Sequence, residues 1–255
     1  MSTPVVKVTN LHKVYGEKVA VDDVSFTVEA GEIFGVLGPN GAGKTTAVEC
    51  VAGLRHADGG HLTVLGVDPQ AEPERVRPFL GIQFQEAGLH DKITVEEALH
   101  LFAGFYPKPA DADALICLLD LEDKRTTQYA KLSGGQKQRL SIALALVGSP
   151  KVAILDELTQ GLDPAARRAT WDLVRKVRDA GVTVILVTHF MEEAERLCDR
   201  LVIIDAGRVV AQGSPAELIA SVEGATSLED VFVALTGHSS EPTAHDLATV
   251  LNGAR

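Results

Sequence analysis

A glycine-rich segment with a lysine and two threonines has the composition of a phosphate-binding loop. The segment "GPNGAGKTT" matches the pattern G-x-x-x-x-G-K-[ST], between an all-apolar run typical of a strand and a helical run. We expect Lys44 to reach β- and γ-phosphates, Thr45 to ligate Mg²⁺ and Thr46 to contact the α-phosphate side. The alternative, a glycine turn with an incidental lysine, is disfavoured by the flanking strand and helix. The predicted nucleotide contacts in this loop are Gly38, Pro39, Asn40, Gly41, Ala42, Gly43, Lys44, Thr45 and Thr46.

A second small-residue segment, "KLSGGQKQRL", also has the features of an anion site. Ser133, Gly134 and Gly135 precede a helical run, where backbone N–H groups and the helix start favour negative charge. The segment lies beyond a long helical stretch, so we expect that it does not fold back on the first loop. Two copies of the chain arranged head to tail would then enclose two ATP molecules between them. The alternative is a helix cap with glycines for close packing.

Two adjacent carboxylates end a short apolar run, "VAILDE". A Mg²⁺ ion held by one hydroxyl needs a carboxylate nearby, and Asp156 is the candidate ligand. Glu157 follows where the backbone turns, so we expect it to act as general base, or to polarise the water that attacks the γ-phosphate. The alternative is a pair of caps for the next loop. The phosphate-binding loop favours the catalytic interpretation.

Two further polar residues are expected near the same edge of the sheet. His189 follows the apolar run "VTVILVT", and its imidazole is a candidate contact for the γ-phosphate. Gln85, in "GIQFQEAG", is a candidate contact for Mg²⁺ or for the attacking water. Gln83 is a competing choice for that role. The predicted catalytic set is therefore Glu157, His189 and Gln85, and the predicted metal set is Thr45, Gln85 and Asp156.

The elements that position these residues follow from the hydrophobic pattern. "VVKVTNLHKVY" and "VDDVSFTVEAG" alternate apolar and polar residues, as half-buried antiparallel strands do. Later apolar runs alternate with capped helices, which predicts a mostly parallel sheet covered on both faces. The stretch from about 86 to 150 is helical, with a capping box at Thr94 and Glu97. Its first helix should bury one face formed by Val95, Ala98, Phe102 and Phe105.

Composition narrows the possible settings of the chain. The 255 residues carry 24 Lys and Arg against 35 Asp and Glu, a net charge of −11, which disfavours a broad nucleic-acid surface. No apolar run approaches the roughly 20 residues of a membrane span, and no secretory signal is visible. The three cysteines, Cys50, Cys117 and Cys198, are scattered, so buried reduced thiols are expected. We therefore expect a cytoplasmic protein.

Taken together, these motifs resemble the nucleotide-binding subunit of ATP-binding cassette (ABC) transporters, from about Val5 to Gly237. The first loop is similar to the Walker A loop, "VAILDE" to the Walker B strand, Gln85 to the Q-loop glutamine and His189 to the switch histidine. The resemblance adds Tyr15 as an aromatic that stacks on adenine. It identifies Leu132, Ser133, Gly134, Gly135 and Gln136 as a signature that contacts the partner chain's ATP. It identifies Gly161, Leu162 and Asp163 as the D-loop.

The resemblance implies a P-loop NTPase core of α/β class, with a mostly parallel sheet, an N-terminal antiparallel β subdomain and an inserted α-helical subdomain. Residues 1–237 would form the ATPase domain, with the helical insert at about 86–150, and residues 238–255 a C-terminal tail. The implied cofactors are ATP and Mg²⁺. The implied partners are a second nucleotide-binding subunit, with a homodimer favoured, and a separate permease that holds the chain at the inner face of the membrane; no nucleic acid is expected.

Within the family, the chain resembles bacterial drug- and antibiotic-exporter ATPases of the daunorubicin-resistance type. "NLHKVYG", "EAGLHDKITVEEAL" and "SLEDVFVALTG" carry that likeness. The expected cargo is a drug, an antibiotic or a lipid-like compound. One departure is Leu158, where the family usually has proline; both carboxylates remain, so we expect hydrolysis to be retained. The alternatives are a soluble ABC ATPase that acts on ribosomes or DNA and a non-hydrolysing regulatory cassette.

Overall fold

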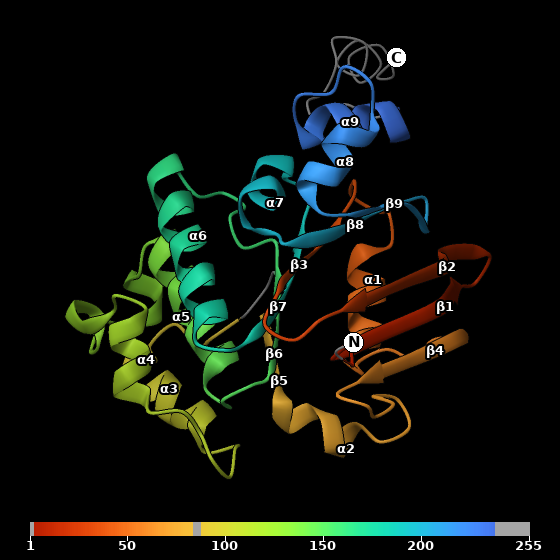
Figure 1. Cartoon of the computed structure of the whole chain (residues 1–255). Helices are drawn as coiled ribbons and strands as arrows, with labels where there is room; N and C mark the ends of the chain where they lie inside the picture. The colour runs from red at the N-terminus through yellow and green to blue at the C-terminus, as the bar shows by residue number, and fades with distance from the viewer. Residues whose placement is uncertain (1–2, 84–87, 238–255) are drawn as a thin grey trace, which may run out of the picture.

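A computed structural model describes residues 3–83 and 88–237, and its N-terminal part contains a small antiparallel sheet (Figure 1). The strand order is β2-β1-β4, with bounds β1 Val6–Tyr15, β2 Lys18–Val28 and β4 Gly59–Val64. Val6 pairs with Val28 on one side and with Val64 on the other. The alternation of apolar and polar residues in this region thus produces the expected antiparallel strands.

A second sheet of six strands forms the centre of the molecule. Its order is β5-β6-β7-β3-β8-β9, and every neighbouring pair is parallel except β8 with β9. The bounds are β3 Ile33–Leu37, β5 Leu80–Gln83, β6 Val152–Asp156, β7 Thr183–Thr188, β8 Arg200–Asp205 and β9 Arg208–Gly213. This is the mixed, mostly parallel sheet that the sequence predicts, together with the N-terminal antiparallel part.

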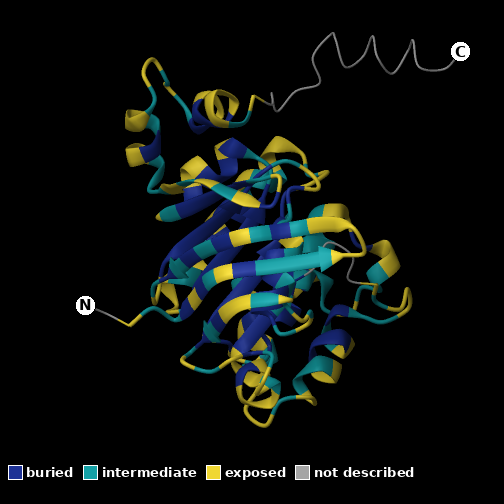
Figure 2. Ribbon diagram, turned by 90° about the vertical axis from the view of Figure 1, so that its right-hand side faces the viewer, coloured by how far each residue is buried: buried dark blue, intermediate teal, exposed yellow. Residues whose placement is uncertain are grey.

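Successive residues of the central strands enter two different cores. In β3, Ile33 and Leu37 belong to one cluster of buried apolar side chains, whereas Phe34 and Val36 belong to the other. Side chains alternate across a strand, so an all-apolar run is required when both faces of the sheet are covered. The central strands are accordingly buried along their length, while β1 and β2 alternate with exposed positions (Figure 2).

Helices cover the two faces of the central sheet in different ways. Helix α1, Lys44–Val51, contacts all three strands of the antiparallel sheet and shares one core with them. The other core receives α5 Gly134–Leu146, α6 Pro164–Asp179 and α7 Met191–Leu197. Figure 1 shows this division, with α1 toward the antiparallel sheet and α5 and α6 on the opposite side. Asp163 caps α6 and accepts from two backbone N–H groups, as the sequence predicts.

Between β5 and β6 the described chain is helical, as expected. It contains α3 Val95–Ala103, α4 Ala112–Leu118, the short 3-10 turns η2 Glu122–Lys124 and η3 Tyr129–Lys131, and then α5. The predicted capping box of Thr94 and Glu97 is present. The predicted apolar face is wrong at Phe105: α3 ends before that residue, and its ring is 72% exposed.

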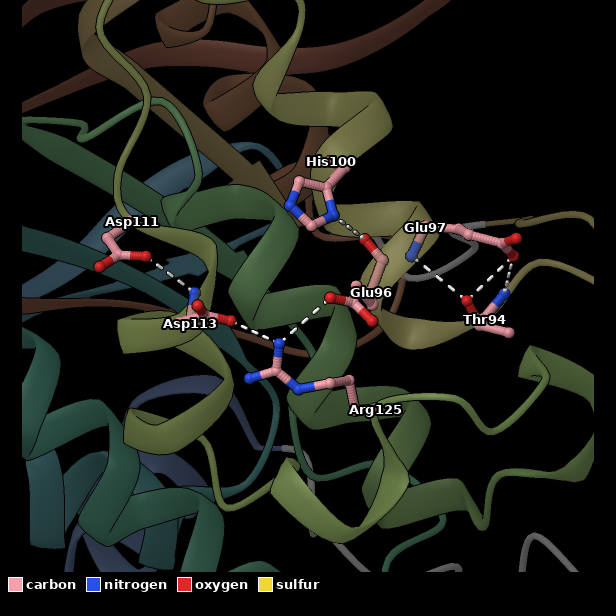
Figure 3. A network of polar contacts seen from close by, with 7 residues as sticks. All are labelled: Thr94, Glu96, Glu97, His100, Asp111, Asp113 and Arg125. Atoms are coloured by element: carbon pink, nitrogen blue, oxygen red, sulfur yellow. Dashed lines mark hydrogen bonds and ion pairs between the residues drawn. The ribbon is translucent and has the colours of Figure 1, made fainter.

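One arginine joins the first two of these helices (Figure 3). The Arg125 guanidinium donates to Glu96 on α3, at 3.2 Å, and to Asp113 on α4. Its backbone carbonyl also accepts from the N–H of Glu96 at 3.1 Å. Arg125 thus holds the first turn of α3 against the segment that continues toward Ser133.

The C-terminal part of the described chain ends in two capped helices. They are α8 Pro215–Ser221, with Ser214 as its cap, and α9 Leu228–Thr236, with Gly237 in a left-handed conformation at its end. The short helix α2, Pro73–Val76, and the 3-10 turn η1, Arg77–Phe79, precede β5. The tail expected at 238–255 lies outside the described residues. Within 3–83 and 88–237, no helix has both the length and the apolarity that a membrane crossing requires.

The cysteines are only partly as expected. Cys50 and Cys198 are buried free thiols, whereas Cys117 is exposed, so the prediction of burial is wrong there. Leu115 and Ile116, next to it on α4, turn into the core, and Cys117 lies on the outer side of the same helix. The exposure of Cys117 is decided by its position on α4, which the spacing of the three cysteines in the sequence does not reveal.

Candidate nucleotide site

The glycine-rich loop passes from β3 into α1 with no space for side chains at two of its glycines. Gly43 has φ of 101°, and a Cβ there would lie 2.3 Å from the carbonyl oxygen of Ala20. A Cβ on Gly38 would lie 2.0 Å from the carbonyl oxygen of Ile204. Neighbouring backbone from β2 and β8 therefore holds the loop closely, and only glycine fits at both positions. Helix α1 begins directly after this loop, so its first N–H groups face the same space.

Lys44 is buried within the loop that carries it. Its side chain is 5% exposed, and Nζ donates to the carbonyl oxygens of Gly38, at 2.8 Å, and Pro39, at 3.0 Å. Burial lowers the pKa of Lys44, although the carboxylates of Glu157 and Asp156 act in the opposite direction. A triphosphate would supply the anionic partners that the carbonyls provide only in part.

Asp156, the last residue of β6, lies beside the hydroxyl of Thr45. Its Oδ2 accepts from Thr45 Oγ1 at 3.4 Å, and its Oδ1 is buried with no hydrogen-bond partner among the described residues. Burial, and secondarily the neighbouring carboxylate of Glu157, raises the pKa of Asp156 to about 6, while Lys44 and Thr45 act in the opposite direction. A hydroxyl, a carboxylate and an oxygen lacking a partner form a donor set that suits Mg²⁺.

Glu157 adopts a backbone conformation that is uncommon for residues other than glycine. Its φ is 48°, and its N–H donates to the carbonyl of Val187 in β7 at 2.9 Å. Its side chain meets His189, whose Nδ1 lies 3.1 Å from Glu157 Oε1. With Glu157 ionised, this bond requires the proton on Nδ1 of a neutral imidazole. The residue predicted to act on the attacking water and the residue predicted to contact the γ-phosphate are therefore in direct contact.

A cavity of about 450 Å³ opens at this edge of the sheet. Residues of the loop, the start of α1 and the end of β6 line it, together with residues of β1 and β2. The lining residues are Tyr15, Lys18, Ala20, Asn40, Gly41, Gly43, Lys44, Thr45, Thr46, Glu157 and Gln160. Lys18 and Ala20 were not predicted from the sequence, because β2 lies at the cavity only once the sheets are assembled. Gln160, in the loop after β6, was not predicted either. Six charged or hydroxyl-bearing side chains line one mouth, which suits a nucleotide with phosphates.

Tyr15 stands at the end of β1 with its ring 40% exposed. Lys13 Nζ lies 5.4 Å and the Arg55 guanidinium 5.3 Å from the ring centroid. An exposed ring beside the glycine loop offers a flat face to a base, and the two cations fix its orientation. The predicted stacking residue thus lies at the same cavity as Lys44.

The segment at Leu132 to Gln136 does not line this cavity. Ser133 caps α5 through a capping box with Gln136, and Ser133 and Gly134 are exposed. A Cβ on Gly134 would meet nothing within 4 Å, and one on Gly135 would meet only Ala166 in the first turn of α6. The segment therefore lies beside the start of α6, the helix that Asp163 caps, with Ser133 and Gly134 exposed.

The predicted metal and water contact Gln85 lies outside the described residues. Gln83, the competing choice, is buried at the end of β5, and its Oε1 accepts the N–H of Asp156 at 3.2 Å. This bond fixes the end of β6 against the end of β5. Gln83 therefore holds the backbone of Asp156, whereas Thr45 meets its side chain.

A second hollow of about 380 Å³ has a different character. It lies between the end of β5 and helices α3 and α5, and its lining is mainly apolar, with Leu54, Phe102 and Tyr106 among its residues. It contains none of the residues predicted to bind a nucleotide. The phosphate chemistry therefore belongs to the cavity at Lys44.

The glycine loop between β3 and α1, with Thr45 and Asp156 at one edge of a mostly parallel sheet, defines a P-loop nucleoside triphosphatase. The added antiparallel sheet and the helices between β5 and β6 are those of an ABC ATPase. The model of the ABC transporter family matches residues 21–160, more than half of the chain. The chain belongs to the ABC transporter family, as an ATP-binding subunit.

Individual relatives and solved structures agree with this assignment. The chain is 43% identical over 225 residues to the "Nod factor export ATP-binding protein I" of Burkholderia lata, covering 86% of this chain and 74% of the relative. It is 41% identical over 226 residues to the protein of the same name from Rhizobium etli, covering 87% and 72%.

Two solved structures share the fold over most of their length. One, described as the ATP binding subunit of an ABC transporter, superimposes with a TM-score of 0.80 at 30% identity, covering 91% of this chain and 99% of that one. The second is cbiO1 from Clostridium perfringens, described as part of the ABC transporter complex cbiONQ. It gives a TM-score of 0.77 at 28% identity, covering 85% and 91%.

Proposed function

We propose that this chain hydrolyses ATP as one half of a dimer, and that hydrolysis drives export through a separate membrane permease. The observation that carries the proposal is the contact of His189 with Glu157, which lines the cavity together with Lys44 and Thr45. Asp156 lies beside the Thr45 hydroxyl. A protein that binds a nucleotide without hydrolysing it has no need of a glutamate with a strained backbone whose carboxylate is paired with an imidazole at that position.

Each residue has a defined part in the proposed reaction. The loop N–H groups and Lys44 hold the β- and γ-phosphates, and Tyr15 stacks on the base. A water attacks the γ-phosphorus, the bond to the bridging oxygen breaks, and ADP leaves with that oxygen. Glu157 orients this water and accepts its proton. His189 holds the Glu157 carboxylate through Nδ1 and presents its other nitrogen to the γ-phosphate.

Mg²⁺ fits the donor set that Thr45 and Asp156 offer. No group of three or more His, Cys, Asp or Glu side chains gathers among the described residues. Thr45, Asp156 and phosphate oxygens would hold the ion, with Gln85 as the third predicted protein contact. The ion would neutralise charge on the β- and γ-phosphates. The buried Oδ1 of Asp156, which has no partner in the described chain, supports this assignment.

The position of the predicted signature segment supports the proposed dimer. Leu132 to Gln136 lies outside the cavity of its own chain, and Ser133 and Gly134 are exposed at a helix start. We propose that they contact the ATP of a second copy, and that Gly161, Leu162 and Asp163 lie along the same interface. Residues 1–237 would then act as the ATPase domain, with the helices of about 86–150 as the part that moves.

The permease and the direction of transport are further parts of the proposal. The family implies a permease partner, which would hold the chain at the cytoplasmic face of the membrane, where ATP is available. The relatives' names support export. Their names specify Nod factor as cargo, whereas the resemblance noted in the sequence implies a drug, an antibiotic or a lipid-like compound. We therefore propose export, and the experiment that tests it compares these two classes of cargo.

The test is to purify the tagged chain from membranes of its native cells and to measure phosphate release from Mg-ATP. We expect a co-purified multispanning membrane protein and an ATPase activity that one class of cargo stimulates. Co-purification with ribosomes or DNA, or a complex without ATPase activity, would contradict the proposal.

A further inference from the structure

One carboxylate in the core lies outside the proposed mechanism. Glu193 is on α7, the helix that follows His189, and its side chain is 0% exposed. Burying a carboxylate away from water is costly unless other groups hold it. A residue of this kind therefore needs a structural or a functional reason.

The partners of Glu193 come from both chain segments that carry the catalytic pair. The indole N–H of Trp171, on α6, donates to Glu193 Oε1 at 3.1 Å. The hydroxyls of Thr188 and Thr159 lie near enough to lower the pKa of this carboxyl, although Glu193 Oε2 and Thr159 Oγ1 each lack a partner at full hydrogen-bond geometry among the described residues. Thr159 is two residues after Glu157, and Thr188 is the residue before His189.

The residues around Glu193 are themselves buried. Trp171 is 5% exposed, and Thr188 and Thr159 are fully buried. The Thr188 hydroxyl accepts the N–H of Phe190 at 3.0 Å, so its proton is available to the carboxylate. The buried carboxylate thus stands between the loop after β6, the end of β7 and helix α6.

A cation completes the cluster. The Arg167 guanidinium lies over the ring of Phe190, 5.1 Å from its centroid, and its charge acts on Glu193. Phe190 follows His189, and its ring centroid is 4.1 Å from that of the imidazole. The cluster therefore borders both the backbone and the ring of His189.

We propose that Glu193 is a positioning residue that holds the Glu157-bearing loop and the His189-bearing turn in register, through Thr159, Thr188 and Trp171. This inference rests on the proposed hydrolysis and extends it to a residue outside the cavity. The carboxylate does not line the cavity at Lys44. Its effect is on the 3.1 Å contact between Glu157 and His189.

The test compares Glu193→Gln with Glu192→Gln. The first change keeps the size of the side chain, removes the charge facing Arg167 and replaces one acceptor oxygen by a donor. Glu192 is exposed on the same helix and serves as the matched control. For Glu193→Gln we expect kcat to fall about tenfold or more, with KM for ATP changed less than about threefold and the chain still folded. For Glu192→Gln we expect kcat within about twofold of wild type.

Trp171 supplies a second variant and a spectroscopic readout. It is the only tryptophan of the chain, so intrinsic emission reports on this cluster. We expect an emission shift in Glu193→Gln. Glu192→Gln is the control for kcat alone, because Glu192 accepts from Arg196, whose guanidinium lies over the Trp171 ring. Trp171→Phe keeps a ring but removes the donor, and should lower kcat in the same sense. It keeps the proposal testable if Glu193→Gln does not fold.

A double-mutant cycle separates positioning from loss of stability. In a chain that already carries His189→Ala, the further change Glu193→Gln should cost no additional kcat, because both act on the same contact. Unchanged kcat in both Glu193→Gln and Trp171→Phe, or additive losses in the cycle, would overturn the inference while leaving the proposed function intact. A wild-type complex without ATPase activity would overturn both.

Discussion

Glu157 and His189 meet across two neighbouring strands, with 3.1 Å between Oε1 and Nδ1. Glu157 follows β6 and His189 follows β7, and these strands are parallel partners, so both side chains leave the sheet at the same edge. The bond from the Glu157 N–H to the carbonyl of Val187 fixes the turn from which the carboxylate projects. The pair is therefore a product of strand order as well as of residue type.

Glu157→Gln should remove the proton acceptor and leave nucleotide binding in place. We expect phosphate release to fall by about 100-fold or more, the usual range for loss of a general base. ATP-bound dimers should accumulate and elute earlier in size-exclusion chromatography with Mg-ATP. Glu192→Gln, at an exposed position, should change neither measurement. An unchanged rate, or a variant that stays monomeric with ATP, would contradict the assignment.

Lys44→Ala should weaken ATP binding without unfolding the chain. Nζ is held by two loop carbonyls, and a charge-assisted bond to phosphate contributes about 1.5 to 3 kcal/mol. We therefore expect ATP affinity to fall about tenfold or more in a nucleotide titration. Lys7→Ala removes an exposed lysine of β1 and should leave the affinity unchanged. Equal affinities of wild type and Lys44→Ala would show that the triphosphate does not reach this lysine.

Much of the fold could be predicted because local patterns and tertiary structure agree in this chain. The all-apolar run at β3 predicts a strand with both faces covered, and both faces are covered. Asp163, Ser214 and Thr94 each sit at a helix start, since a side-chain oxygen there can accept otherwise unsatisfied N–H groups. The glycine loop is recognised from consecutive residues, although the backbone of Ala20 and Ile204 decides that Gly43 and Gly38 must be glycine.

The remaining features depend on contacts between residues that are far apart in the sequence. Lys18 reaches the cavity only because β2 pairs with β1 and lies against the loop. In the sequence, Glu193 is one of several acidic residues of a helix. Its burial is evident only from the packing of α6 against α7. Phe105 fits the helical spacing of α3, but the helix ends before it, so periodicity alone misplaces its ring.

Tyr15 gives a prediction about the base. Stacking of a base on an aromatic ring contributes about 1 to 3 kcal/mol, so Tyr15→Ala should lower ATP affinity about tenfold. Tyr15→Phe keeps the ring and should bind ATP nearly as well as wild type. The measurement is a fluorescent-nucleotide titration of both variants. Equal losses in the two variants would indicate that the hydroxyl, and not the ring, contacts the nucleotide.

Gly43 gives a prediction about the stability of the loop. Gly43→Ala places a Cβ 2.3 Å from the Ala20 carbonyl oxygen at a φ of 101°, so it should lower the free energy of unfolding by more than about 1 kcal/mol. Gly16 also has a positive φ, of 57°, but a Cβ there meets nothing within 4 Å. Gly16→Ala therefore isolates the backbone term, about 1 kcal/mol, and should be the milder change in urea denaturation. The opposite order would show that the loop relaxes away from β2.

Glu193 gives a prediction about pH. Burial raises the pKa of Glu193, while the hydrogen bonds of Thr188, Trp171 and Thr159 and the charge of Arg167 act in the opposite direction. Cys198, which faces the same carboxylate, has a pKa raised well above its ordinary value by burial and stays neutral. The native chain thus binds this proton more tightly than the unfolded chain. Its contribution to stability is complete below the unfolded pKa and is lost as pH rises through the folded pKa.

Glu193→Gln does not titrate, so its free energy of unfolding relative to wild type should increase with pH. The slope is at most about 1.4 kcal/mol per pH unit for one proton, measured by urea denaturation between pH 5 and pH 8. Trp171→Phe removes a donor that lowers the pKa, so its stability relative to wild type should change in the opposite direction. A pH-independent difference for Glu193→Gln would show that folding leaves the proton affinity of this carboxyl unchanged. Glu193→Gln should therefore be less active than wild type and should gain stability relative to wild type as the pH rises to neutral. The reason is that the charge of Glu193 destabilises the fold and at the same time positions Glu157 and His189.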